Sequence, residues 1–181
     1  LIEDALTSRT KAILPVHLTG RPAEMGPITE IAKNHGLRVV EDAAQSFGSH
    51  LGGRQSGTFG QFGCFSAHPL KNLNAAGDAG IVVTDDDEMA ARIRRLRNHG
   101  LVDRDNVDEW GWVSRMDTLQ AALLLQRLGR LKSVFERRRQ NVELYRSLLD
   151  AEYVFHPPCQ ASEFNTFHTF VIQVPERDGL K

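Results

Sequence analysis

The sequence predicts an α/β fold in which helices flank a mainly parallel sheet. Two apolar segments, 11–17 (KAILPVH) and 37–42 (LRVVED), have the composition of buried strands, and 27–36 (PITEIAKNHG) between them has apolar residues at helical spacing. A strand, a helix and a second strand in this order form a parallel crossover unit, because parallel neighbours need a long connection. Ligands bind at the carboxyl ends of strands in such sheets, and Asp42 lies at that end.

The next segments continue the sheet. Residues 47–63 contain six glycines, which predicts an irregular loop or a short hairpin. The segments 64–68 (CFSAH) and 80–85 (GIVVTD) are predicted strands. Acidic residues early in 86–100 and basic residues late in it favour a helix that ends at a glycine.

The last third of the chain predicts two helices and a further strand. A polar loop over 101–114 carries two tryptophans, and a nearly continuous apolar stripe over 116–131 predicts a buried helix. A long helix over 132–149 has the length of a connector, and 167–174 (FHTFVIQV) alternates like a strand. We expect part of a large domain at 1–130, a connecting helix at 131–150 and the start of a small α+β domain at 151–181.

Charge and cysteine content narrow the class of protein. Lysine and arginine number 22 against 23 acidic residues, a net charge of −1, so no electrostatic case exists for nucleic acid or an anionic membrane. The longest apolar run, 121–125, is too short to span a bilayer. Cys64 and Cys159 form no CxxC pair, which argues against a zinc site and favours a reducing, cytoplasmic setting. We expect no metal.

Three side chains in two neighbouring segments carry the functional hypothesis. Asp42 ends the predicted strand in EDAAQ, while Ser66 and Lys71 lie in CFSAHPLKN. An amine that forms a Schiff base, a carboxylate that keeps a pyridine nitrogen protonated and a hydroxyl that donates to a phosphate are what a protein needs to hold pyridoxal 5′-phosphate (PLP). A solvated lysine and a helix-capping aspartate are the ordinary explanations of each residue alone. Their order and spacing, 71 − 42 = 29 residues, fit two loops on adjacent strands of a sheet.

Six motifs together resemble the sugar aminotransferases of the DegT/DnrJ type, which are fold-type I PLP enzymes. They occur in the family's order and cover essentially the whole chain. The motifs are KAILPVHLTGRPAEM (11–25), LRVVEDAAQSFGS (37–49), FSAHPLKNL (65–73), GDAG (77–80), VSRMDTLQAALL (113–124) and FHTFVI (167–172). Because Leu1 opens the chain and Lys181 ends it within a segment predicted to be structured, we expect an internal fragment of a longer protein.

The resemblance implies a role for each motif residue. Lys71 corresponds to the Schiff-base lysine and proton shuttle, Asp42 to the partner of the pyridine nitrogen, and Ser66 to a phosphate ligand. Gln45 corresponds to the residue near the ring hydroxyl, and Ala44 to a small residue beneath the ring. Two residues of the lysine motif are expected to face the substrate: His68 and Asn72.

The resemblance also implies a reaction and an assembly. We expect an amino group to pass from an amino acid such as glutamate, by way of PLP, to a nucleotide-linked keto sugar or a keto-cyclitol. We expect a homodimer whose site lies at the interface, with the loop 101–114 crossing to the partner.

Two alternatives keep the fold and change the function. A keto-deoxysugar dehydratase of this family has His in place of the lysine, so Lys71 argues against it. A degenerate or regulatory relative is the second alternative, and it draws support from Val113 and Ala79, where the family commonly has Asn and Gly.

Overall fold

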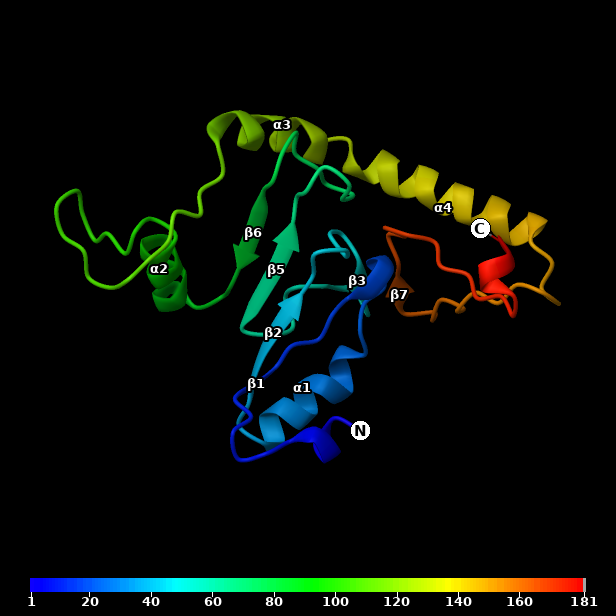
Figure 1. The fold of residues 1–181 in the computed structure, drawn as a ribbon, viewed down its shortest axis with the longest axis horizontal. Coiled ribbons are helices and arrows are strands. Elements are labelled where there is room, and N and C mark those ends of the chain that lie inside the picture. The colour runs from blue at the N-terminus through cyan, green and yellow to red at the C-terminus, as the bar shows by residue number, and fades with distance from the viewer. Residues whose placement is uncertain (181) are drawn as a thin grey trace.

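The computed structural model describes residues 1–180, whose centre is a four-stranded sheet in the order β1-β2-β5-β6 (Figure 1). β1, β2 and β5 are parallel, and β6 runs antiparallel to β5. The expected α/β fold with a mainly parallel sheet is therefore confirmed. The strands of this sheet are β1 (Ala12–Ile13), β2 (Arg38–Asp42), β5 (Phe62–Ser66) and β6 (Gly80–Val83).

β1 is shorter than the apolar run 11–17 predicts, and the reason is Pro15. Proline has no N–H to give to a sheet ladder, so regular pairing ends before it. The chain rejoins β2 beyond it, where Val16 forms a parallel bridge with Asp42. The segment that follows β1 thus lies against the carboxyl end of β2.

Helix α1 (Met25–Asn34) packs on the sheet through one apolar face. Met25, Ile28 and Ala32 recur at helical spacing, and all three are buried in a cluster with Val39 of β2. Burial of a large apolar side chain contributes roughly 1.5–3 kcal/mol, so this face holds the crossover in place.

A second, smaller sheet lies beside the first, in the order β4-β3-β7. The glycine-rich stretch folds into a two-stranded hairpin, one of the two forms that the sequence predicts, and a segment near the end of the chain adds the third strand. His50 stacks on Phe164 across this junction with ring centroids 4.8 Å apart. The strands are β3 (His50–Leu51), β4 (Arg54–Gln55) and β7 (Glu163–Phe164).

Helix α2 (Asp87–Leu96) follows β6 and begins at a capping aspartate. The Asp86 side chain accepts a hydrogen bond from the Met89 backbone N–H at 3.0 Å, which satisfies one of the free N–H groups of the first turn. The helix predicted over 86–100 is therefore confirmed, although it is shorter at both ends and spans Asp87–Leu96.

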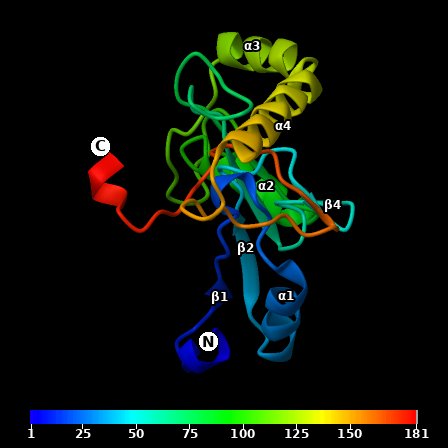
Figure 2. The same ribbon diagram turned by 90° about the vertical axis from the view of Figure 1, so that its right-hand side faces the viewer.

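Helices α3 (Thr118–Leu128) and α4 (Leu131–Leu148) follow one another along one side of the molecule in both views (Figures 1 and 2). The expected helix over 132–149 is confirmed. A second core cluster joins these helices to the loop after β5. Its buried members are Ala67, Leu73, Ala75, Leu124, Leu131 and Phe135.

Helix α3 corrects the prediction of a buried helix over 116–131. Only Leu124 of this helix is buried, while Leu119 and Leu125 are 80% and 72% exposed. Its apolar stripe is wider than the surface that the described residues offer it, so one edge packs on the cluster and the rest faces outward.

The strand predicted over 167–174 is also wrong. Residues 167–172 are irregular, and only Gln173 forms a bridge, with Phe155. Alternation alone does not make a strand without a partner, and β3 pairs instead with Glu163–Phe164. The three-part domain division stays a proposal, with α4 as the element that joins its parts. Short 3₁₀ helices occupy Glu3–Ala5, Leu18–Gly20 and Arg177–Leu180.

Candidate active site

Lys71, Ser66 and His68 line one open cavity of about 1340 Å³ beside β5 and β6. Ser66 ends β5, and the chain then turns so that the Lys71 N–H donates to the His68 carbonyl at 2.9 Å. The Ser66 hydroxyl oxygen accepts from the His68 N–H at 3.2 Å, which leaves its own proton free to be donated. The structure thus brings together the amine, the hydroxyl and the imidazole of the lysine motif.

Apolar residues on either side anchor the loop that carries Lys71. Leu73 and Ala75 are buried in the cluster with Leu124, and the Ala75 N–H donates to the Ala67 carbonyl at 2.8 Å. The lysine therefore lies on a short exposed turn whose two ends are packed in the core. Within the described residues its amine forms no ion pair.

Helix α3 fixes the same loop through polar contacts. Arg127 donates to the backbone carbonyl and the side-chain oxygen of Asn74, at 2.5 and 2.6 Å, and Gln120 accepts from the Ala76 N–H at 2.8 Å. Guanidinium hydrogen bonds of this kind are among the stronger ones in proteins. Asn74 is therefore an anchoring point of the loop.

Asp42 lies at the carboxyl end of β2, next to the cavity wall. Its register partner in β5 is Cys64, which lines the cavity. One carboxylate oxygen accepts from the Ala44 N–H at 3.0 Å, so this oxygen is held and the other is available. Burial raises the pKa of the Cys64 thiol, and the negative charges of Asp42 and Glu41 raise it further, so Cys64 is an uncharged wall residue.

Gln45 is held by the loop that follows β1. The Thr19 N–H donates to its side-chain carbonyl oxygen at 2.8 Å, which leaves the amide NH₂ of Gln45 as a donor. Thr19 has a φ of 63°, an uncommon conformation for a residue with a side chain. Such strain persists only where surrounding contacts fix it, and it clusters at functional sites.

Sequence reasoning missed His168, which lines the same cavity as Lys71. Its Nδ1 atom is buried and has no hydrogen-bond partner among the described residues. Burial lowers the pKa of His168, and the positive charges of Lys71 and Arg138 lower it further, so the ring is neutral near pH 7. No local signal identifies this residue, since 168 − 71 = 97 positions separate the two.

Four predicted site residues are not among those that line the cavity: Asp42, Ala44, Gln45 and Asn72. Asn72 is 8% exposed and does not line it, and both polar atoms of its side chain lack partners among residues 1–180. Val113, by contrast, is 61% exposed and does line it. Across the described part of the chain, acidic, histidine and cysteine side chains form no group that could bind a metal ion. No helix among residues 1–180 is both long and apolar enough to cross a bilayer.

Comparison with known proteins identifies the lineage. The chain is 44% identical over 180 residues to a UDP-N-acetyl-3-dehydro-alpha-D-glucosamine 3-aminotransferase of Acidithiobacillus ferrooxidans, with 99% of this chain and 49% of the relative covered. It is 40% identical to a pleiotropic regulatory protein of Geobacillus stearothermophilus, again over 99% of this chain and 49% of the relative.

The same likeness appears in three dimensions. A crystal structure of S. venezuelae DesV in complex with a ketimine intermediate superposes with a TM-score of 0.94 at 41% identity, covering 99% of this chain and 49% of DesV. The chain thus spans about half the length of the relatives it matches. The family profile matches residues 1–181, and the chain belongs to the DegT/DnrJ/EryC1/StrS aminotransferase family.

Proposed function

We propose that the protein containing this chain is a PLP-dependent aminotransferase. It moves an amino group from an amino acid such as glutamate to a keto sugar linked to a nucleotide, or to a keto-cyclitol. The observation that carries the proposal is that the unpaired Lys71 amine and the Ser66 hydroxyl line one cavity, while Asp42 is the register partner of Cys64, which lines the same cavity.

The donor set fits the cofactor. PLP presents an aldehyde, a ring nitrogen, a ring hydroxyl and a phosphate, and the site offers a matching group for each. Lys71 has a free amine, Asp42 has a free carboxylate oxygen, and Gln45 and Ser66 each have a free donor proton. The cavity of about 1340 Å³ exceeds the roughly 300–1,000 Å³ of single small-ligand pockets, so it has room for a substrate as well.

Each residue then has a defined task. When bound, PLP supplies an electron sink that labilises a C–H bond next to the amino group. The Lys71 amine accepts and returns the proton of that C–H bond. Asp42 stays ionised opposite the ring nitrogen, and Ser66 donates to the phosphate.

His68 and His168 are the proposed substrate-facing residues. Both line the cavity with Lys71, and an imidazole ring can donate or accept a hydrogen bond with a sugar hydroxyl. Asn72 follows Lys71 in the chain, and its unsatisfied side-chain amide is the reason to keep it in the proposal, although it does not line the cavity. The substrate class is drawn from the Acidithiobacillus relative, whose name specifies a UDP-linked 3-keto sugar.

The assembly belongs to the same proposal. Trp110 and Trp112 are 96% and 70% exposed on the loop over 101–114, and large exposed aromatic side chains are common anchors of subunit interfaces. We propose a homodimer in which this loop contacts the partner. Both cysteines are free thiols, which accords with a reducing, cytoplasmic compartment.

A regulatory role without turnover is the second candidate. The name of the Geobacillus relative favours it, and so does the exposed Val113 in the cavity, which has no polar atom to offer a phosphate.

One assay separates the two candidates. The full-length protein is incubated with PLP, glutamate and a panel of nucleotide-linked keto sugars and keto-cyclitols. An aminotransferase releases one 2-oxoglutarate for each amino sugar detected by mass spectrometry. PLP binding without 2-oxoglutarate would favour the regulatory role, and no PLP binding would contradict the proposal.

A further inference from the structure

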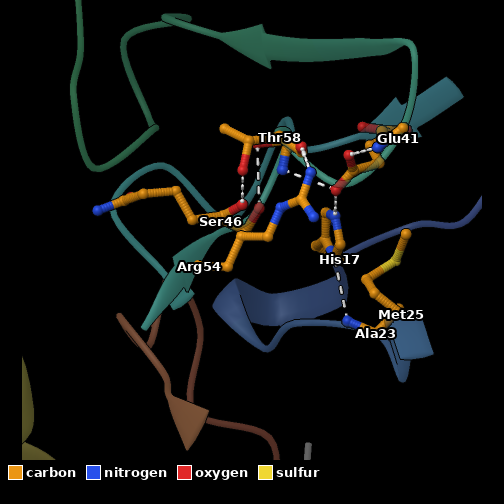
Figure 3. A network of polar contacts seen from close by, with 12 residues as sticks. His17, Ala23, Met25, Glu41, Ser46, Arg54 and Thr58 are labelled. Atoms are coloured by element: carbon orange, nitrogen blue, oxygen red, sulfur yellow. Dashed lines mark hydrogen bonds and ion pairs between the residues drawn. The ribbon is translucent and has the colours of Figure 1, made fainter. Parts of the chain in front are cut away.

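A fully buried histidine and glutamate lie behind the proposed cofactor site. His17 and Glu41 are both 0% exposed, and the His17 Nε2 atom is 2.8 Å from a Glu41 carboxylate oxygen (Figure 3). Glu41 directly precedes Asp42 in β2, and successive side chains of a strand point to opposite faces. The pair therefore lies across the sheet from the Asp42 carboxylate, and nothing in the proposed reaction uses it.

Three donors satisfy the Glu41 carboxylate. His17 Nε2 and the Gly57 N–H, at 2.8 and 2.7 Å, share one oxygen, and the Gly60 N–H bonds the other at 2.6 Å. A buried carboxylate with this many donors stays ionised. It ties together β2, the loop after β1 and the loop before β5.

The hydrogen bonds also assign the His17 tautomer. The Ala23 N–H donates to His17 Nδ1 at 2.9 Å, so Nδ1 is the acceptor and carries no proton. Nε2 must then carry the proton that it donates to Glu41. Figure 3 shows His17 lying between Glu41 and Ala23, with a dashed contact to each.

The anchored histidine fixes the backbone that touches the site. The His17 N–H donates to the Asp42 carbonyl at 3.0 Å, and the Asp42 N–H donates to Pro15 at 2.9 Å. Two residues further on, the strained Thr19 holds Gln45 at 2.8 Å. One short segment thus contacts the backbone of Asp42 and the side chain of Gln45.

The next residue, Gly20, joins that segment to the irregular stretch that carries His168. Gly20 has a φ of 96°, and a Cβ there would lie 2.7 Å from the His168 backbone nitrogen. A displaced His17 would therefore shift the turn at 18–20 and the contacts on both sides of it.

We infer that His17 and Glu41 are positioning residues, which hold Asp42 and Gln45 in the geometry that receives the ring of PLP. The inference rests on the proposed function. A buried pair of this kind contributes little net stability compared with apolar residues of the same volume, because its desolvation offsets its attraction. Its effect is to hold β2, the loop after β1 and the loop before β5 in one arrangement, with the His17 proton on Nε2.

The test compares two His17 variants in the full-length protein. His17→Leu removes both hydrogen bonds, whereas His17→Gln keeps one donor and one acceptor. His35, which lies 3.5 Å from Glu3 on the surface, provides the matched control His35→Leu. Each protein is purified without cofactor, checked by far-UV circular dichroism and thermal unfolding, and titrated with PLP while the absorbance maximum of the bound cofactor is recorded.

The expected result is a graded loss. His17→Leu raises the Kd for PLP at least tenfold, about 1.4 kcal/mol, and moves the absorbance maximum, while His17→Gln recovers most of the affinity. His35→Leu matches the wild type. A His17→Leu protein that unfolds at a lower temperature but binds PLP with unchanged Kd and spectrum would make the pair merely structural and overturn the inference.

Nitrogen-15 NMR of the wild-type histidines covers the case in which His17→Leu does not fold. The geometry requires His17 to be protonated on Nε2 alone, with and without PLP. A spectrum with the proton on Nδ1, or on both nitrogens, would overturn the inference. A wild-type protein that binds no PLP would instead count against the proposed function, because the tautomer is measured independently of the cofactor.

Discussion

Asp42 of β2 and Cys64 of β5 are register partners in the parallel part of the sheet. Because Cys64 lines the cavity that Lys71 also lines, this pairing places Asp42 on the strand next to a residue of the cavity wall. Ser66 follows Cys64 by two residues, on the same side of β5. The pairing of β2 with β5 therefore sets where the predicted site residues on the two strands lie relative to one another.

Asp42→Asn is expected to reduce the rate of amino transfer and leave the fold intact. An amide cannot hold the ring nitrogen protonated, which costs several kcal/mol of barrier, or about 10²- to 10⁴-fold in rate at ~1.4 kcal/mol per decade. The rate of 2-oxoglutarate release measures the loss of activity. Asp85→Asn, on the exposed segment after β6, is the control. Full activity would remove Asp42 from the site, and loss of the circular dichroism signal would favour a structural role.

Glu41 is expected to make stability depend on acid pH. Burial raises its pKa, but the hydrogen bonds from His17, Gly60 and Gly57 outweigh that effect, so its pKa lies below the ordinary value of 4.5. The unfolded chain thus binds a proton more readily, and stability falls as the pH drops below 4.5.

Urea unfolding of the full-length protein at a series of acid pH values measures this effect. Glu41→Gln should flatten the acid part of the stability curve, whereas Glu3→Gln, a surface carboxylate 3.5 Å from His35, should leave it unchanged. Identical pH curves for the wild type and Glu41→Gln would contradict the assigned ionisation.

Asp86→Ala is expected to destabilise the protein by about 1 kcal/mol, the usual effect of losing a helix N-cap. Its side chain bonds the Met89 N–H at 3.0 Å, while Asp87, one residue later, makes no capping bond. Denaturant midpoints of the two alanine variants provide the comparison. An equal loss from Asp87→Ala would mean that charge near the helix start matters more than the cap.

Trp110→Glu is expected to shift the full-length protein from dimer to monomer. The side chain is 96% exposed, and a charge at the centre of an apolar interface is costly. Tyr153→Glu is the matched control, because Tyr153 is 62% exposed and lies outside the loop. Sedimentation velocity distinguishes the species, and a wild-type monomer with full activity would refute the interface assignment.

The sequence predicts the crossover sheet well because its signals are local. Apolar strands, the helical spacing of Ile28 and Ala32 and the acidic cap of α2 are each legible within a few residues. The sequence-based predictions fail where an element forms only by pairing with a segment that is distant in the chain. β7 forms at Glu163–Phe164 because β3 offers it a free edge, and the stretch 167–174 finds only one bridge.

The site residues likewise divide into those that local sequence identifies and those that only the fold brings together. Lys71, Ser66 and His68 lie in one motif, and the sequence alone groups them. His168 enters the cavity only because Thr166 and Gly20 hold its segment against the loop after β1, through contacts that span most of the chain. The His17–Glu41 bond is likewise invisible in the sequence, since 41 − 17 = 24 residues separate its ends.

Borohydride reduction of the PLP-loaded full-length protein, followed by peptide mass spectrometry, determines whether Lys71 is the amine that binds the cofactor. Reduction fixes the cofactor to the amine that holds it, so the modified peptide identifies the lysine without any knowledge of the substrate. We expect one pyridoxyl adduct, on Lys71, and its loss in Lys71→Ala but not in Lys11→Ala. An adduct on Lys11 or Lys132, or no adduct at all, would contradict this assignment.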